Sequence, residues 1–341
     1  MFGKALRSAL VCGAISLSAA PAIADDNKGI DDTSRIPVYD ALKGKRVVFI
    51  PLAMGIDLTE GWYRAMKKNG AEFGYDVQVL DPNWNTEAGI RALNTAIAGK
   101  ADMIVLHNPD IQSYAKLVQR AQKSGSKVVE VGLQSLGGAD AAVVGDYQRG
   151  GEIGANLIVE RCGKGGSGPS NKVAIVLGPP TAANSVFAQR GFWTVVDQHP
   201  EIEVVSQQVG NYDPVKIRSI MSTIMQQHPD LCGYMGMWDN ADAGAGAAVI
   251  EAGKKDQVFI ASLSSGGRAM CENVKNGLIT AAITYSLPMQ SSAINAMIVD
   301  RLQSKAPPGE AKSIVFTPAT VVTSNNAQGI QCWTPDDIDK L

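Results

Sequence analysis

The sequence predicts an α/β protein that folds as two lobes, each built on a parallel β-sheet, and three observations lead to this prediction. Short β-branched, apolar runs alternate with helical patterns from Arg46 to Gln303. Runs that are apolar throughout are typical of strands covered by helices on both faces. The chain has 341 residues, about twice a common domain size, and this many strand–helix units exceed one compact open sheet.

Each expected strand is a short, mostly apolar run bounded by polar or turn-forming residues. In chain order the expected strands are Arg46–Ile50, Val77–Leu80, Met103–Leu106, Lys127–Val131, Ala142–Val144, Val173–Leu177, Glu203–Val209, Gly233–Met237, Val258–Ala261 and Ile279–Thr284.

Helices are expected between these strands, and the helix expected at Pro214–Gln227 has the clearest pattern. Residues 217, 220, 221, 224 and 225 are all Ile or Met and form one helical stripe. Asp213 is an N-cap residue, and Pro214 follows at the first helical position, where its missing N–H has no cost. The expected helices are Thr59–Phe73, Thr86–Ala98, Ile111–Ser124, Gln148–Arg161, Val186–Gln198, Pro214–Gln227, Ala241–Ala252, Arg268–Asn276 and Pro288–Gln303.

The N-terminus predicts an export signal over residues 1–24. Lys4 and Arg7 precede the short apolar run Ser8–Ala20, and Ala22 and Ala24 form an A-x-A cleavage site. We therefore expect a periplasmic protein, cleaved after Ala24 and followed by a flexible lead-in over residues 25–44. Cys12 makes a lipoprotein signal the alternative, but the residue before it is Val rather than Gly or Ala. Cleavage removes two of 31 basic residues and none of 33 acidic ones, so the net charge changes from −2 to −4.

Composition excludes several classes of protein. Apolar residues make up 45% of the chain and charged residues 19%, which argues against disorder. The near balance of acidic and basic residues argues against a basic nucleic-acid interface. No internal run approaches the roughly 20 apolar residues of a membrane-spanning helix.

Four cysteines remain after the expected cleavage. They are Cys162, Cys232, Cys271 and Cys332, an even number in an oxidising compartment, so structural disulfides are expected. Four cysteines allow three pairings, and the sequence does not choose between them; four buried free thiols are the alternative. Without a CxxC or Cys/His cluster, no metal site is expected.

Motifs for catalysis or for a nucleotide are not convincing. The glycine-rich stretch 163–168 follows a helix and precedes a strand, the reverse of a phosphate loop, and it lacks the Gly-Lys-Ser/Thr ending. His199 and His228 precede prolines at helix ends, whereas His107 closes a strand and could border a cleft. No G-x-S-x-G elbow and no prominent acidic pair is present. We therefore expect neither an enzyme nor a bound cofactor.

Aromatic and neutral polar residues gather at the carboxyl ends of the expected strands, where open α/β sheets bind ligands. Aromatic rings pack on the apolar faces of sugar rings, and amides or carboxylates pair with hydroxyls. A sugar or polyol is therefore the expected ligand class. The residues that we predict to bind it are Asp57, Thr59, Asn108, Gln134, Asn184, Arg190, Tyr212, Trp238, Asp239, Ser264 and Tyr285.

The chain after Gly44 resembles a type I periplasmic binding protein of the ribose/galactose transport group, which has a LacI-like fold. The resemblance depends on the order and spacing of short motifs. They are Phe73-Gly74-Tyr75 with Val77–Asp81, Asn108-Pro109, Gly145-Asp146 before Gly150-Gly151, Gly191-Phe192, Tyr212-Asp213, His228-Pro229-Asp230, Asp239 before Gly244-Ala245, and Leu287-Pro288.

The resemblance implies two Rossmann-like lobes joined by a three-crossover hinge that closes over the ligand. The N-terminal lobe would comprise residues 45–145 and 286–318, the C-terminal lobe residues 146–285 and 319–332, with a last strand at Ala319–Thr323, and residues 333–341 would form a tail. It also implies a monomer that delivers its ligand to an ABC transporter permease in the inner membrane. A sensing receptor of the same fold, signalling to a membrane kinase or chemoreceptor, is the alternative. A LacI-type repressor is opposed by the export signal.

Several polar positions of the family's cleft differ here. Its paired aromatics fall at Leu58 and Thr59, and its Asp-Arg pair falls at Gly132 and Leu133. Its cleft Arg falls at Ala188, with Arg190 nearby. The Asn of its Asn-Asp pair is Trp238, and the acidic residue expected near Ser264 is a serine. Because groups built to pair a hydroxyl discriminate strongly, these losses argue against ribose or galactose as the ligand.

Overall fold

The computed structural model describes residues 30–340, which fall into two units divided after Pro37. The expected signal peptide and its cleavage site lie outside the described residues. Helix α1 (Ile30–Leu42) covers part of the segment that we expected to be a flexible lead-in. In the second unit, Leu42 is fully buried and the ring of Tyr39 stacks on Phe73 at 5.2 Å. The apolar residues of this segment do not recur at helical spacing, so the sequence did not predict a helix here.

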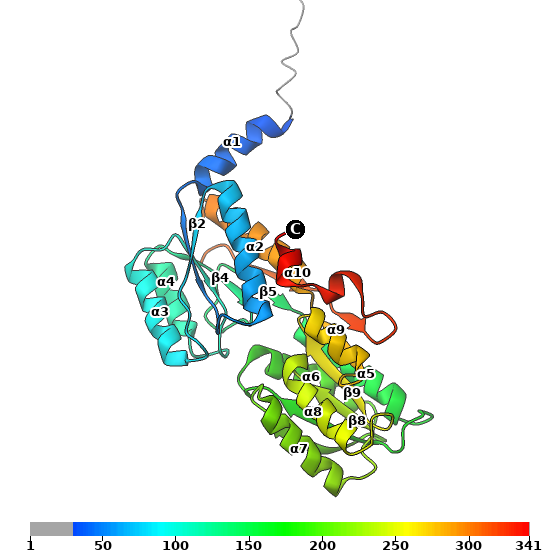
Figure 1. Cartoon of the computed structure of the whole chain (residues 1–341). Helices are drawn as coiled ribbons and strands as arrows, with labels where there is room; N and C mark the ends of the chain where they lie inside the picture. The colour runs from blue at the N-terminus through cyan, green and yellow to red at the C-terminus, as the bar shows by residue number, and fades with distance from the viewer. Residues whose placement is uncertain (1–29, 341) are drawn as a thin grey trace, which may run out of the picture. The chain divides into compact units, whose positions relative to one another are not determined.

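The first lobe is a six-stranded sheet in the order β11-β5-β4-β3-β1-β2, with all of its strands parallel. Helices α2 and α10 cover one face, and α3 and α4 cover the other (Figure 1). The strands are β1 (Arg46–Ile50), β2 (Asp76–Val79), β3 (Met103–Leu106), β4 (Lys127–Gly132), β5 (Ala141–Gly145) and β11 (Ser313–Thr317). The helices are α2 (Asp57–Phe73), α3 (Thr86–Ala98), α4 (Ala115–Lys123) and α10 (Leu287–Gln303).

The second lobe repeats this arrangement in the order β12-β10-β9-β8-β6-β7, except that β12 is antiparallel to β10. Helices α5 and α6 cover one face, and α7, α8 and α9 the other. The strands are β6 (Lys172–Leu177), β7 (Glu203–Val209), β8 (Gly233–Gly236), β9 (Phe259–Ser264), β10 (Ala281–Thr284) and β12 (Thr320–Val322). The helices are α5 (Tyr147–Cys162), α6 (Ala183–Val196), α7 (Pro214–Gln227), α8 (Asp239–Glu251) and α9 (Arg268–Lys275).

The chain passes between the two sheets three times: after β5 at Gly145, after β10 at Thr284 and after β11 at Thr317. The predicted α/β fold with two lobes and three crossovers is therefore confirmed. The predicted start of α7 is also as observed, because the Asp213 side chain accepts hydrogen bonds from the amides of Val215 and Lys216.

Two C-terminal segments differ from the sequence-based prediction. Strand β11 was not predicted, because its alternating Ser-Ile-Val-Phe-Thr run is short and lies at a sheet edge. The expected tail begins at a buried residue, Trp333, and contains α11 (Pro335–Ile338) after the 3₁₀ helix η1 (Gly329–Cys332). Helix α11 packs on α2, where Arg64 pairs with Asp339 at 2.8 Å. Trp333 Nε1 donates to the Ser265 carbonyl at 3.2 Å, so this segment contacts both lobes.

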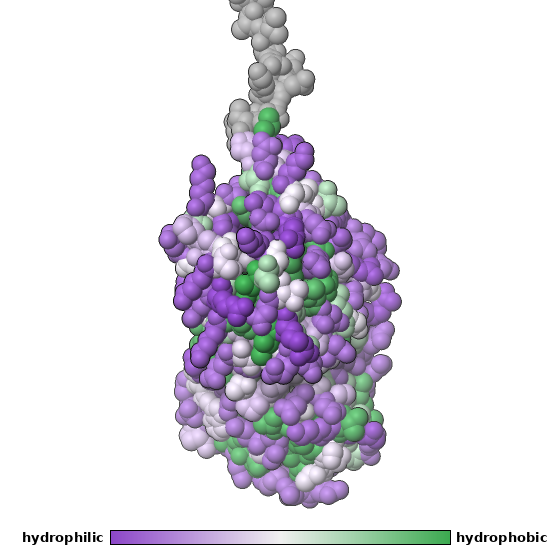
Figure 2. All heavy atoms as spheres, turned by 90° about the vertical axis from the view of Figure 1, so that its left-hand side faces the viewer, coloured by the Kyte–Doolittle hydropathy of each residue, from purple (hydrophilic) through white to green (hydrophobic). Residues whose placement is uncertain are grey.

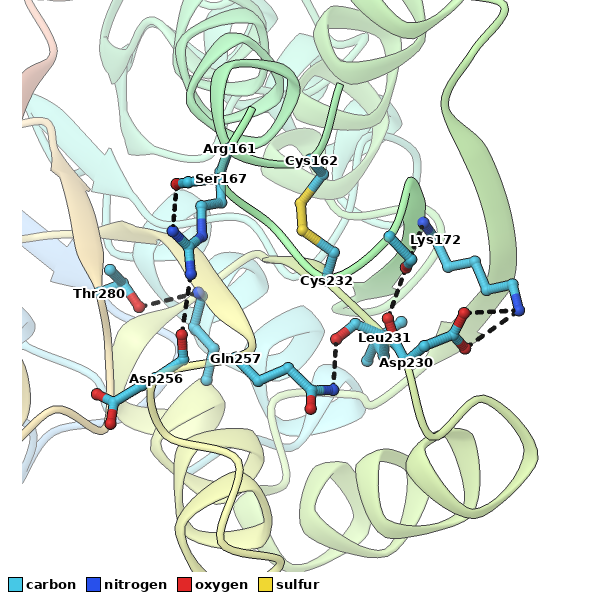
Figure 3. Close-up of a disulfide and its surroundings, with 12 residues drawn as sticks. Arg161, Cys162, Ser167, Lys172, Asp230, Leu231, Cys232, Asp256, Gln257 and Thr280 are labelled. Carbon is cyan, nitrogen blue, oxygen red and sulfur yellow. Dashed lines mark hydrogen bonds and ion pairs between the residues drawn. A yellow bond between two sulfur atoms is a disulfide. The ribbon is translucent and has the colours of Figure 1, made fainter. Parts of the chain in front are cut away.

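Both disulfides lie in the second lobe, and they resolve the pairing that the sequence left open. Cys162 pairs with Cys232, and Cys271 pairs with Cys332. Figure 3 shows the first bond joining the end of α5 to the residue before β8, with the Lys172–Asp230 ion pair close by. A side chain on Gly168 would meet Cys232 Sγ at 2.3 Å. The glycine-rich stretch 163–168 therefore fits closely against a disulfide.

The side of the molecule that carries α3 and α4 is mainly hydrophilic, with hydrophobic residues in scattered groups (Figure 2). Within residues 30–340, no helix is long and apolar enough to span a membrane. Some exposed hydrophobic residues are common on protein surfaces.

Candidate functional site

Residues from both lobes line two adjoining cavities at the carboxyl ends of the central strands, the expected place for a ligand in this architecture. The first, which we name the large cavity, has a volume of about 460 Å³ and is lined by Leu52, Pro82, Trp84, Asn85, Thr86, Pro109, Asp110, Tyr114, Pro179, Thr181, Asn211, Tyr212 and Trp238. The second, the aromatic cavity, is lined by Leu52, Ile56, Leu58, Trp62, Trp84, His107, Gly132, Leu133, Tyr147, Asn184, Tyr212, Trp238 and Tyr285.

Aromatic rings from the second lobe and from the first crossover meet edge to face. Tyr212 and Trp238 have ring centroids 5.8 Å apart, and Tyr147 and Tyr285 have centroids 5.5 Å apart. Tyr212 lies in the turn between β7 and α7 with a φ of 59°. Trp238 is the N-cap residue of α8, directly after β8. Both residues therefore follow strands of the second sheet and present flat surfaces to the same space.

The polar groups on this side bond mainly to one another. The Tyr212 hydroxyl donates to Asn184 Oδ1 at 2.5 Å, and Asn184 Nδ2 donates to the Met237 carbonyl at 3.3 Å. Burial raises the pKa of Tyr212 above its usual range. The phenol is therefore neutral at ordinary pH and acts as a fixed hydrogen-bonding group.

The wall from the first lobe is apolar and closely packed. Trp62 is fully buried on α2, and its indole meets the His107 ring edge to face at 5.1 Å. Gly132 ends β4 with a φ of 66°, and a Cβ there would lie 2.6 Å from Trp62 and 3.0 Å from His107. Burial lowers the pKa of His107 to about 3, so its ring is neutral. Position 132 accepts only glycine beside this indole.

Two buried carboxylic acids lie behind Trp238. Asp239 and Asp242 are 2% and 1% exposed. Burial raises the pKa of Asp239 to about 7; a hydrogen bond from the Ser264 hydroxyl opposes this increase, and the Asp242 charge adds to it. The pKa of Asp242 is raised by burial to about 6, although its carboxylate accepts hydrogen bonds from Tyr234, Ser262 and the Trp238 amide.

The structure brings four of the predicted ligand-binding residues together around the aromatic cavity: Asn184, Tyr212, Trp238 and Tyr285. Gln134 instead lines a third cavity of about 310 Å³, beside the first crossover and next to Tyr147, Phe187 and Phe316. The remaining predicted residues line none of these three cavities. They are Asp57, Thr59, Asn108, Arg190, Asp239 and Ser264, and as ligand-binding residues they stay predictions.

The positions of these six residues have local explanations. Asp57 is an exposed residue in the first turn of α2, and Arg190 is exposed on α6 with its guanidinium over the Phe187 ring. The Thr59 hydroxyl donates to the Ala53 carbonyl, and Asn108 Nδ2 donates to the Leu133 carbonyl. Ser264 is the last residue of β9 rather than part of the following loop, because that strand runs three residues further than expected.

Sequence reasoning missed most of the apolar wall. Trp62 was included in an expected helix, where a buried tryptophan looks like core. Trp84 stands in a turn with a φ of 63° after β2, and no pattern singled it out. Tyr147 begins α5, directly after the first crossover. Its position next to an expected crossover between the lobes could have indicated that it lines the cavity.

One backbone hydrogen bond joins the lobes at the cavity rim. The Ile111 amide, after β3, donates to the Thr181 carbonyl, after β6, at 3.0 Å. Within the part of the chain that the structure describes, no group of three or more His, Cys, Asp or Glu residues could hold a metal ion. The site therefore has the means to enclose a small molecule between two lobes by ring stacking and hydrogen bonds.

Two parallel-sheet lobes, three crossovers and a cavity lined from both sides define the class of two-lobe solute-binding proteins. The chain belongs to the family described as the periplasmic binding protein domain, whose model matches residues 47–306.

Relatives and structures agree with this family. The chain is 29% identical to a D-apiose import binding protein of Paraburkholderia graminis over 191 residues, 55% of this chain and 59% of that protein. It is 24% identical to a D-ribose/D-allose-binding protein of Pseudomonas aeruginosa over 79% of this chain and 84% of that one. The fold matches a glucose-galactose binding protein from Geobacillus stearothermophilus with a TM-score of 0.73 and 19% identity, over 83% of this chain and 99% of the other.

Proposed function

We propose that this protein is an exported receptor that captures a sugar or polyol between its lobes and delivers it to an ABC transporter permease in the inner membrane. The observation that carries the proposal is the pair of adjoining cavities lined from both lobes, with the rings of Trp84, Tyr212 and Trp238 on both. Rings of this kind stack on the apolar faces of sugars. The names of the apiose and ribose/allose relatives support the same ligand class.

The proposed location is the periplasm, with the mature chain beginning at Asp25. The n-region, apolar run and A-x-A site in residues 1–24 support export. The two disulfides support it independently, because disulfides persist in oxidising compartments. Mass spectrometry of the protein recovered from a periplasmic extract tests the cleavage site, and an intact N-terminus would contradict it.

Thermal unfolding of residues 25–341 with a panel of pentoses, hexoses and polyols tests ligand capture. A ligand at 100 times its Kd should stabilise the protein by about 2.7 kcal/mol through mass action. Compounds that shift the melting temperature are then titrated by calorimetry. The absence of any shift across the whole panel would contradict the proposed ligand class.

Trp238→Ala tests whether the cavity is the binding site, because it removes a ring that both cavities share. We expect the Kd for any panel compound that binds to rise at least tenfold, the equivalent of about 1.4 kcal/mol. Trp193→Ala is the matched control, since Trp193 is a partly buried indole on α6 that lines none of the three cavities. Equal effects of the two substitutions would place binding elsewhere.

A further inference from the structure

The two walls of the aromatic cavity offer different chemistry to a ligand. The first lobe contributes hydrocarbon side chains from the loop after β1 and from α2, which include Leu52, Ile56 and Leu58, and the buried indole of Trp62. The second lobe contributes Asn184, Tyr212, Trp238 and Tyr285. The aromatic cavity has a volume of only about 40 Å³, so only a small part of a ligand held in the large cavity can enter it. That part has one side against apolar atoms and the other against rings that carry polar tips.

On the first-lobe side, hydrogen-bonding capacity is small in the aromatic cavity alone, because Asn85, Thr86, Asp110 and Tyr114 line the large cavity. In the aromatic cavity, Trp62 Nε1 and His107 Nδ1 are buried without a hydrogen-bond partner among the described residues, and an indole nitrogen can only donate. The Tyr147 hydroxyl already donates to the Gly132 carbonyl at 2.8 Å. A carboxylate cannot be added at position 132, because a Cβ there would lie 2.6 Å from Trp62.

Ionised side chains are also scarce around the ligand space. Among the described residues that line the aromatic cavity, none is an acid, a lysine or an arginine. Asp110 is the acid on the wall of the large cavity, and its carboxylate accepts from the amides of Gln112 and Ser113. A charged group that enters the aromatic cavity would lose its hydration without gaining an opposite charge.

We infer that the ligand is an uncharged sugar or polyol that carries one edge without hydroxyls, through deoxygenation or a small alkyl substituent, and that this edge enters the aromatic cavity against the first lobe. This inference rests on the proposed function. A hydroxyl buried against Leu52, Ile56 and Leu58 loses its water and finds few hydrogen-bond partners, which weakens binding. A methylene in the same place is removed from water, which strengthens binding.

Matched ligand pairs test the inference by calorimetry on the mature protein. The pairs are L-fucose with L-galactose, 2-deoxy-D-ribose with D-ribose, and methyl β-D-glucoside with D-glucose. In at least one pair, we expect the less hydroxylated or methyl-bearing member to bind at least tenfold more tightly. If the fully hydroxylated members bind more tightly or equally in every pair, the inference is overturned while the proposed function stands. If none of the six compounds binds, the inference is overturned, whereas the proposed function is overturned only if no compound of the whole panel binds.

A substitution on the apolar wall tests the orientation of the ligand. Leu58→Asn adds hydrogen-bonding groups to the first-lobe side. In the ligand pair whose two Kd values differ tenfold in the wild type, the ratio of the Kd values should therefore fall toward one. Leu136→Asn is the control, because Leu136 is 67% exposed and lines none of the three cavities. A preference that Leu58→Asn leaves unchanged would overturn the assignment of the bare edge to the first lobe. The wild-type ligand pairs keep the ligand class testable if that variant does not fold.

Discussion

The two lobes share a six-stranded topology but stabilise it differently. The first lobe contains no disulfide among its described residues, and it presents hydrocarbon side chains and a buried indole to the cavity. Each lobe buries two carboxylic acids, Glu130 and Asp140 in the first and Asp239 and Asp242 in the second, but both disulfides lie in the second lobe. The same backbone plan thus supports an apolar first-lobe wall in the aromatic cavity and a second-lobe wall of aromatic rings with polar tips.

The two lobes therefore differ in which interactions stabilise them. Buried carboxylic acids reduce stability unless hydrogen bonds compensate, and disulfides limit the entropy of the unfolded chain. In the second lobe the two features occur together, whereas the first lobe buries Glu130 and Asp140 with no disulfide among its described residues. The first lobe depends on close packing around Trp62 and Gly132.

The largest change in the free energy of unfolding is expected when the disulfide between Cys162 and Cys232 is removed. Replacing both with Ser removes a cross-link between residues 70 positions apart. A closed loop of this size corresponds to about 4 kcal/mol of stability in the chain-entropy estimate. Urea unfolding followed by circular dichroism measures the change.

The same experiment with dithiothreitol provides the control. Reduction should destabilise the wild type, and it should affect the Cys162→Ser/Cys232→Ser variant less, because one bond remains there. If reductant leaves the wild-type midpoint unchanged, the second lobe does not depend on its cross-links, and the contrast between the lobes fails.

Packing of the first lobe is tested by Gly132→Ala, for which we expect a loss of about 2–3 kcal/mol. The added methyl would overlap Trp62, and the residue would keep a left-handed backbone. Gly125→Ala separates the two causes, since Gly125 has a φ of 98° but nothing within 4 Å of an added Cβ. That control should lose only about 1 kcal/mol, the cost of the backbone alone. Equal losses in urea unfolding would show that the packing around Trp62 is not tight.

The sequence was sufficient for the fold but only for part of the candidate site. Strands such as β1 and β6 are apolar throughout, and helices such as α7 have a cap and a stripe, so local signals are enough. Tyr212 and Trp238 could be placed because they follow strands directly. Trp62 could not, because its role depends on Gly132, 70 positions away in the chain, leaving room for its ring. Such long-range fit is not encoded in any local pattern.

The smallest expected change in stability comes from the buried Asp239 of the second lobe, and it depends on pH. The Asp239 carboxyl has a pKa of about 7 in the folded state against 3.8 in the unfolded chain. The unfolded state therefore loses its proton first as pH rises, and stability falls between about pH 4 and pH 7. Asp239→Asn removes this dependence, so the variant should gain about 1–2 kcal/mol relative to the wild type at pH 8 and little at pH 4.

Asp242→Asn is the matched control for the pH experiment. The Asp242 carboxylate accepts hydrogen bonds from Tyr234, Ser262 and the Trp238 amide. Because burial also raises the pKa of Asp242, removing its charge favours the folded state at pH 8, but an amide nitrogen cannot accept these bonds. We expect the lost hydrogen bonds to outweigh the gain, so that this variant loses stability at pH 8. Thermal unfolding of both variants at pH 4, 6 and 8 measures the difference. If Asp239→Asn gains equally at all three values, the Asp239 side chain is not the source of the pH dependence, and the second lobe buries its acids without the cost inferred here.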